Sequence, residues 1–152
     1  MESLRIVLMG KDFELRVISL ITRARELSDE VMLLDLGSTD STIELAERVN
    51  CEVKNHDGDT FAPTLAGSII PESDSIVTLL ININSRLKLR DIPLLVNRAK
   101  ENWDIHMAYI SEETDHSNPQ EITYKSAEIS HLASTKIGLE HLAKSGLDQN
   151  PI

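Results

Sequence analysis

Three uninterrupted apolar runs constrain the fold of this chain more than any other feature. They cover residues 5–9, 31–34 and 76–81, and each is shorter than an ordinary helix. Segments with helical spacing lie between them. From Phe13, for example, apolar residues recur at positions 17, 20, 21, 24 and 27. Strands that are apolar on both faces are typical of a parallel sheet covered by helices on both sides. The sequence therefore predicts an α/β fold with a mostly parallel sheet.

Shorter patterns extend this alternation along the chain. We expect further strands at 51–54 and 105–110 and further helices after residues 41, 60 and 91. Residues 111–120 are polar and acidic and are predicted to form a loop. Residues 121–145 have a helical pattern with a break near Gly138. Since no repeat or linker interrupts the sequence, residues 1–152 are predicted to form one domain.

The charge balance argues against several classes of protein. The formal net charge is -10, which repels nucleic acid, because affinity for nucleic acid depends on cations that neutralise phosphates. Arg86, Lys88 and Arg90 form one basic cluster, which we interpret as a solvated loop edge rather than a phosphate contact. No apolar run approaches the roughly 20 residues that span a bilayer. We therefore expect neither a nucleic-acid partner nor a transmembrane segment.

The N-terminus and the cysteine content indicate a compartment. The first residues, Met-Glu-Ser-Leu-Arg, lead straight into a strand-like run and lack the layout of a signal peptide. The single cysteine, Cys51, cannot form an internal disulfide and leaves no cysteine-based zinc site. A cytoplasmic location is the simplest expectation from these two features.

Polar residues follow three of the predicted strands. They are Gly10-Lys11-Asp12, the stretch from Asp35 to Asp40, and Asn82-Ile83-Asn84. In open α/β sheets the ligand lies beyond the carboxyl ends of the strands. The sequence therefore predicts a candidate ligand site where these three stretches meet.

The stretch EVMLLDLGSTDSTIELAERV resembles the second βα unit of family 2 glycosyltransferases, whose usual form is Val-Asp-Asp-Gly-Ser-Thr-Asp followed by a helix. Three later stretches are similar to the family in the same order: CEVKNHD, TFAPTLAGSII and ESDSIVTLLININSRLKLRDIPLLV. The resemblance covers residues 4–110. It implies a nucleotide-diphospho-sugar transferase-like (GT-A-like) fold, a nucleotide-sugar donor and a divalent metal ion.

The resemblance also implies roles for individual residues. Asp35 would lie near the nucleotide base, and Ser38 and Asp40 would shape the same pocket. Asp12 loosely keeps the acid of the family's first loop, usually Pro-x-Tyr-Asn-Glu, which here reads MGKDFE. Asn82 and Asn84 fall on the two metal-binding acids of the family's Asp-x-Asp motif.

Several departures from the family pattern concern the metal and the acceptor. Leu36 replaces the second acid of the Asp-Asp pair, and the Asn82-Ile83-Asn84 stretch is a degenerate Asp-x-Asp motif. Near 4 Å, with an effective dielectric of about 20, one charge pair contributes on the order of 4 kcal/mol, so two neutral ligands bind Mg²⁺ or Mn²⁺ poorly. Residues 111–152 are also few for the family's acceptor half. We expect no metal site and no other cofactor.

The same residues have purely structural interpretations. Asp35 can cap the turn at Ser38 through an Asx-type hydrogen bond, and this alternative to ligand contact stays open. For Asp40 we favour a role at the start of the next helix, where the Ser-x-x-Glu pattern from Ser41 to Glu44 predicts a capping box. Asn82 and Asn84 can simply end a strand. His131 and His141 lack the i, i+4 spacing of a helical metal pair.

Three functions remain open at this point. The first is a non-catalytic module that binds a nucleotide or nucleotide sugar. The second is a relative in fold alone, which associates with itself or with a protein partner through an exposed sheet edge or residues 121–145. The third is an active transferase with an atypical donor site that uses Mg²⁺ or Mn²⁺, for which Asp59 and Glu112 are candidate bases. The neutral residues and Leu36 count against the third function.

Overall fold

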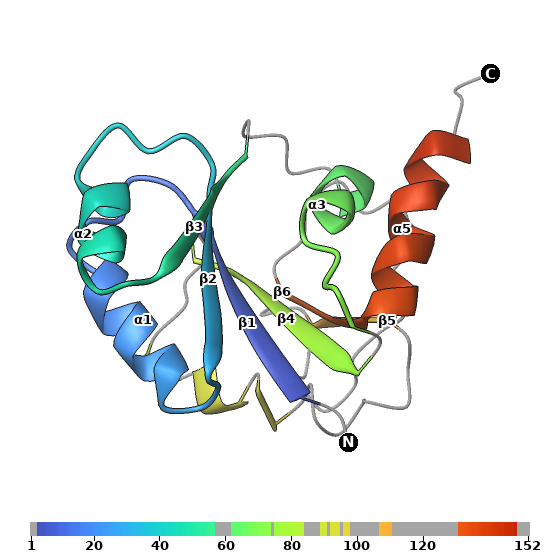
Figure 1. Ribbon diagram of the computed structural model, residues 1–152, viewed down its shortest axis with the longest axis horizontal. Coiled ribbons are helices and arrows are strands. Elements are labelled where there is room, and N and C mark those ends of the chain that lie inside the picture. Colours follow the sequence, from blue (N-terminus) through green and yellow to red (C-terminus); the bar gives the residue numbers. More distant parts are fainter. Residues whose placement is uncertain are drawn as a thin grey trace.

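Six strands form one sheet in the order β3-β2-β1-β4-β6-β5 (Figure 1). The computed structural model describes residues 3–56, 62–73, 75–83, 89–90, 92–94, 96–97, 107–110 and 131–148. The strands are β1 (Ser3–Gly10), β2 (Glu30–Asp35), β3 (Glu52–Asn55), β4 (Ile76–Asn82), β5 (Met107–Ile110) and β6 (His131–Thr135). The helices are α1 (Val17–Arg25), α2 (Thr42–Arg48), α3 (Ala62–Ser68) and α5 (Lys136–Asp148).

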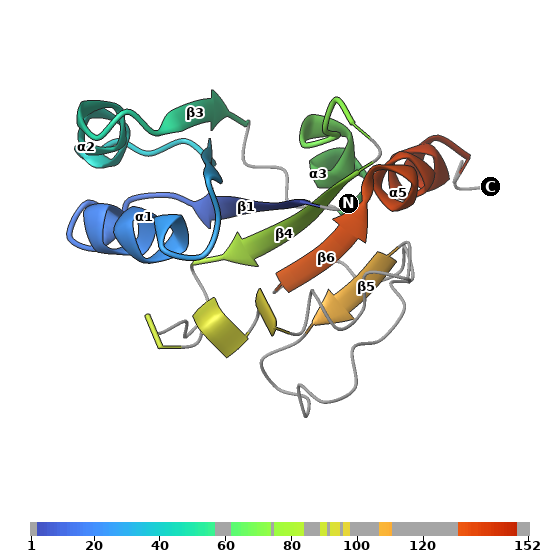
Figure 2. The same cartoon turned by 60° about the horizontal axis from the view of Figure 1, so that its bottom comes forward.

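The strand directions confirm the predicted mostly parallel sheet. Strand β1 pairs in parallel with both β2 and β4, and β2 pairs in parallel with β3. Strand β6 lies between β4 and β5 and is antiparallel to both (Figure 2). Five strands therefore run in one direction, and β6 alone runs in the other.

Helices cover both faces of the sheet, as the apolar runs predict (Figure 1). Alternate residues of β1 point to opposite faces: Ile6 and Leu8 belong to the core cluster beneath α1 and α2, and Val7 and Met9 belong to the cluster beneath α3 and α5. All four are completely buried. Strand β1 is thus the centre of the domain.

The strand register brings the predicted polar ends together. Gly10 of β1 is aligned with Asp35 of β2, and Met9 is aligned with Asn82 of β4. The strands that contain Met32 and Leu79 flank β1 and end at the same edge of the sheet, as expected from the sequence.

The prediction of a helix over residues 121–145 is wrong for residues 131–135, which form β6. This strand is inserted between two others, so His131, Leu132, Ala133 and Ser134 are all buried, and the strand lacks the alternation that marks a half-exposed strand. Helix α5 then begins at Lys136, and Gly138 lies inside it without a break.

Other sequence predictions are refined or lie outside the described residues. The first helix begins at Val17, and Phe13 packs into the core from the preceding loop. Residues 92–94 and 96–97 are helical, as predicted. The acidic stretch 111–120 and Asn84, Asp59 and Glu112 lie outside the described part of the chain. In that described part, no helix has the length and apolar character needed to span a membrane.

Candidate functional site

Asp35 ends β2 and is held by the turn that follows it. One carboxylate oxygen, Oδ2, accepts hydrogen bonds from the backbone N–H groups of Gly37 at 3.0 Å and Ser38 at 2.9 Å. The other oxygen, Oδ1, accepts one from the Ser38 hydroxyl at 2.5 Å. Gly37 has a φ of +105°, which glycine adopts without strain. Since Asp35 is only 1% exposed, the turn-capping interpretation describes its observed contacts.

Asp12 joins the loop after β1 to the loop after β2. Its Oδ1 accepts hydrogen bonds from the backbone N–H groups of Thr39 at 2.8 Å and Asp40 at 3.3 Å. In return, the Asp12 N–H donates to the Ser38 hydroxyl oxygen at 2.9 Å. Asp12 has a φ of +56°, a region that aspartate tolerates better than most residues. The backbone turns sharply here and aims the carboxylate at the neighbouring loop.

Thr42 and Asp40 continue the same connection inside the molecule. The completely buried Thr42 hydroxyl accepts a hydrogen bond from the Phe13 N–H at 2.9 Å and donates one to Asp40 Oδ1 at 2.5 Å. The Thr42 N–H donates to the same oxygen at 2.9 Å. Asp40 Oδ2 accepts a further bond from the Glu14 N–H at 3.2 Å. Asp40 is thus a helix-start residue, the role we favoured from the sequence.

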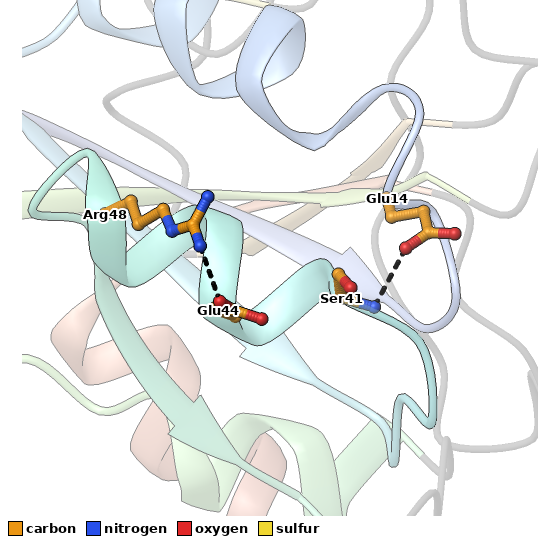
Figure 3. Close-up of polar contacts among 4 residues, drawn as sticks. All are labelled: Glu14, Ser41, Glu44 and Arg48. Atoms are coloured by element: carbon orange, nitrogen blue, oxygen red, sulfur yellow. Dashed lines mark hydrogen bonds and ion pairs between the residues drawn. The ribbon is translucent and has the colours of Figure 1, made fainter.

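The predicted capping box is wrong in its residues. The Ser41 side chain makes no capping hydrogen bond, and the Ser41 N–H donates to Glu14 of the other loop at 3.0 Å (Figure 3). Glu44 instead pairs with Arg48 at 2.7 Å on the exposed surface of α2, where an ion pair adds little stability. The Asp40 carboxylate caps the helix start in place of the Ser41 side chain. The Glu14 carboxylate binds the Ser41 N–H in place of Glu44.

Hydrogen bonding shifts the pKa of Asp40. Burial alone would raise the pKa of this carboxyl, but the hydrogen bonds from the Thr42 side chain and the N–H groups of Thr42 and Glu14 outweigh that effect. The pKa of Asp40 therefore lies below its usual value of 3.8. The charged form is the one that the two loops bind.

Leu36 and Asn82 occupy the positions where the sequence departs from an acidic site. Leu36 is 8% exposed and packs in the core cluster beneath α3 and α5. Its N–H donates to the Gly10 carbonyl at 3.0 Å, and the N–H of Ile83 donates to the Met9 carbonyl at 2.9 Å. Asn82 is the half-buried last residue of β4. The edge next to β1 is therefore filled with apolar side chains and paired backbone.

The carboxylates at this edge do not converge on a cation site. Within the described part of the chain, no group of three or more His, Cys, Asp or Glu side chains is arranged to hold a metal ion. Asp12, Asp35 and Asp40 accept hydrogen bonds from neutral donors of the two loops. His131 is buried on β6 beside Ile81, and His141 is exposed on α5.

Two cavities lie at the opposite edge of the sheet, near the amino ends of β1, β2 and β3. Their volumes are about 280 Å³ and about 330 Å³, and Arg5, Glu30, Met32 and Glu52 line both. Burial lowers the pKa of the Arg5 guanidinium, and Glu30 and Glu52 oppose that shift. The sequence reasoning did not single out these residues. The one feature of the sequence that could have indicated them is the presence of charged residues near the beginnings of these strands.

Two cations on the sheet face that carries α3 bind the end of this helix. The guanidinium of Arg5 donates to the Ile69 carbonyl and to the Thr78 hydroxyl, and Lys54 donates to the Ser68 carbonyl. Carbonyls at a helix C-terminus lack intrahelical partners and carry partial negative charge, so cations stabilise them. Arg5 and Lys54 therefore have a structural role.

The fold is shared with solved structures, although no family model and no curated protein sequence matches this chain. Glucosyl-3-phosphoglycerate synthase from Mycobacterium tuberculosis in complex with UDP matches with a TM-score of 0.60 and 17% identity over 90% of this chain and 57% of that one. The chain has a glycosyltransferase-like fold. This confirms the GT-A-like fold predicted from the resemblance; identity this low establishes the fold alone.

Two further complexes of the same synthase give similar matches to the glycosyltransferase-like domain. The complex with Mn²⁺ and UDP-glucose has a TM-score of 0.58 and 17% identity over 90% of this chain and 57% of that one. The complex with Mn²⁺, UDP-glucose and phosphoglyceric acid has a TM-score of 0.58 and 16% identity over 97% of this chain and 66% of that one. The glycosyltransferase-like domain thus spans 57% of the first two synthase chains.

Thr42 provides a test of the connection between the loops. Thr42→Val keeps the shape of the side chain but leaves the buried Phe13 N–H without its acceptor, which we expect to cost about 1 to 3 kcal/mol. For a domain of this length the melting temperature should fall by roughly 3 to 10 °C. Thr42→Ser is the matched control, because it keeps the hydroxyl and loses one methyl group, about 1 kcal/mol. Thermal unfolding of both variants measures the difference, and equal losses would contradict the proposed role of the hydroxyl.

The lowered pKa of Asp40 predicts a pH dependence of stability. Because the folded-state pKa is below the unfolded value of about 3.8, the stabilisation is fully present above that value and is lost as pH falls through the folded-state pKa. Urea unfolding of the wild type and of Asp40→Asn should show a gap in midpoint at neutral pH, with the wild type more stable. This gap should narrow below about pH 4. A gap that does not change with pH would show that the charge of Asp40 is irrelevant.

Proposed function

We propose that this chain is a glycosyltransferase-like domain that binds a nucleoside diphosphate or nucleotide sugar without a metal ion and does not catalyse metal-dependent transfer. The observation that carries the proposal is the use of the carboxylates at the carboxyl edge of the sheet. Asp12, Asp35 and Asp40 hold the two loops in a fixed arrangement and are not directed at a common cation.

Counting acceptor positions explains why a metal is disfavoured. An ionised carboxylate has about four lone-pair positions. Asp35 uses three of them for the turn, and Asp40 uses three for Thr42 and Glu14. Asn82, at the end of β4, offers a neutral carbonyl oxygen. About one position is left on each carboxylate, so fuller coordination of Mg²⁺ or Mn²⁺ would compete with hydrogen bonds that position both loops.

Binding of a nucleotide is supported by the fold and by the fixed loops. Solved structures of this fold contain UDP, and UDP-glucose with Mn²⁺. Ligands of open α/β sheets lie beyond the carboxyl ends of the strands, and the loops after β1 and β2 are already ordered there. A diphosphate bound without a metal needs another cation. Lys11, exposed one residue beyond β1, is suitably placed to supply it.

Thermal unfolding with nucleotides tests this proposal. At about 100 times its dissociation constant, a bound ligand adds roughly 2.7 kcal/mol to stability, so the midpoint should rise by about 5 to 10 °C. We expect this rise with at least one of UDP, GDP, CDP and dTDP, with or without Mn²⁺. A flat response to all four would reject nucleotide binding. A rise that requires Mn²⁺ would instead favour the active transferase.

Lys11→Ala provides a cleaner binding variant than Asp35→Ala. Asp35→Ala removes three hydrogen bonds of a buried carboxylate, so it would disturb the loop whether or not a ligand binds. Lys11 is exposed, and a substitution there should leave the melting temperature of the free protein within about 1 °C. The nucleotide-induced rise should shrink in Lys11→Ala and persist in Lys11→Arg. An unchanged rise in Lys11→Ala would exclude this side chain as the phosphate contact.

Restoring charge tests the account of the missing metal site. The double change Asn82→Asp with Asn84→Asp returns two carboxylates to the degenerate motif. We expect Mn²⁺ affinity to rise at least tenfold in calorimetric titration, because hard cations prefer anionic oxygens. Micromolar Mn²⁺ binding by the unmodified protein, lost in Asn82→Ala, would contradict this account.

Protein association is a second candidate function, and one observation favours it. Strand β3 stands at the end of the sheet order, and within the described residues it pairs with β2 alone. An open strand edge offers backbone donors and acceptors to another chain.

A further inference from the structure

We infer that β3 pairs with β3 of a second copy of this chain, forming a symmetric antiparallel dimer that extends the sheet. The inference does not depend on nucleotide binding. It rests on the edge of β3 that faces away from β2, where no other described strand pairs, and on the charges that this strand carries. Three of its four residues, Glu52, Lys54 and Asn55, are exposed.

The side chains of β3 point alternately to the two faces of the sheet. Val53 packs against the core cluster beneath α1 and α2. Glu52 is aligned with Met32, which belongs to the cluster on the other face. Glu52 and Lys54 therefore share the face that carries α3 and α5, with opposite charges two residues apart.

Symmetry and charge together select one register for the dimer. Two antiparallel copies of a strand are related by a twofold axis perpendicular to the sheet, and directly opposed residues share a face. When Val53 opposes Val53 of the second copy, Glu52 opposes Lys54 of the second copy, and the reciprocal pair forms as well. Moving the twofold axis by one residue shifts the pairing by two residues and sets Glu52 against Glu52 or Lys54 against Lys54. Only the first register is complementary in charge.

The two charged side chains are able to make these contacts. Lys54 donates one hydrogen bond to the Ser68 carbonyl, and an ammonium group has three donors, so two remain. Glu52 lines both cavities beside the strand and forms no ion pair within the described residues. A contact with the second copy would give this carboxylate a cationic partner.

Charge reversal tests the register in the full-length chain. Analytical ultracentrifugation over a concentration series at low salt should show a reversible monomer–dimer equilibrium for the wild type. Glu52→Lys alone and Lys54→Glu alone should each weaken dimerisation by about tenfold, because each creates two like-charged pairs. The double variant, Glu52→Lys with Lys54→Glu, should recover the wild-type constant. High salt should reduce the differences among the four proteins.

A cysteine pair provides an independent measurement of the register. Val53→Cys would place two cysteines directly opposite each other across the twofold axis, with Cα atoms about 4.5 to 5.5 Å apart, within the range of a disulfide. Mild oxidation should give a covalent dimer on a non-reducing gel. Glu52→Cys is the matched control, because in this register it opposes Lys54 and should cross-link far less. Both variants retain the buried Cys51, which therefore contributes equally.

The alternative is that Lys54 and Glu52 protect the edge against pairing. That alternative predicts a wild-type monomer at every concentration, no rescue by the double variant and no preference for cross-linking at position 53. Any of these three results would overturn the inference. Circular dichroism and melting temperatures check that each variant stays folded, because Val53 is partly buried and Lys54→Glu also removes the hydrogen bond to the Ser68 carbonyl.

Discussion

Hydrogen bonds to carboxylates join the loop after β1 to the loop after β2, and the carboxyl edge of the sheet depends on them. Asp12 reaches the backbone of the second loop, and Glu14 binds the N–H of Ser41. The Thr42 hydroxyl also accepts a hydrogen bond from the Phe13 N–H of the first loop. Because both strands lie at the centre of the sheet, fixing these loops also fixes the starts of α1 and α2. The same hydrogen bonds therefore contribute both to the stability of the domain and to the shape of the candidate site.

This arrangement gives the carboxylates at the carboxyl edge a structural role. A carboxylate that accepts two or three hydrogen bonds from protein N–H and O–H groups is stabilised as an anion by these neutral donors. It loses that stabilisation if a cation displaces the donors. Asp35 and Asp40 are in this state. Leu36, buried where a second acid would stand, adds apolar packing against the same edge. Within the described residues the site thus has ordered backbone and no group of carboxylates arranged around one cation.

The sequence predicted the parts of this structure that depend on local pattern. The apolar runs identified β1, β2 and β4 because each is buried on both faces, and the ends of these strands at Gly10, Asp35 and Asn82 lie at one edge of the sheet, as expected. The helix start at Asp40 followed from its residue type. The wrong predictions have a common physical cause, because the observed structure at those positions depends on contacts with residues distant in sequence. Strand β6 is defined by pairing with β4 and β5, and Glu14 takes the place expected of Glu44 by accepting the hydrogen bond from the Ser41 N–H. Similarly, no local pattern relates Arg5 to the end of α3.

The two edges of the sheet use charge in different ways. At the carboxyl edge, acids from two loops are satisfied by neutral donors, so little charge is available to a metal. At the amino edge, Arg5 binds a carbonyl at the end of α3, while Glu30 and Glu52 form no ion pair in the described structure. Glu52 lies on β3, which pairs with β2 alone within the described residues. A contact between two copies along β3 would give Glu52 a cationic partner and would leave the loops after β1 and β2 undisturbed.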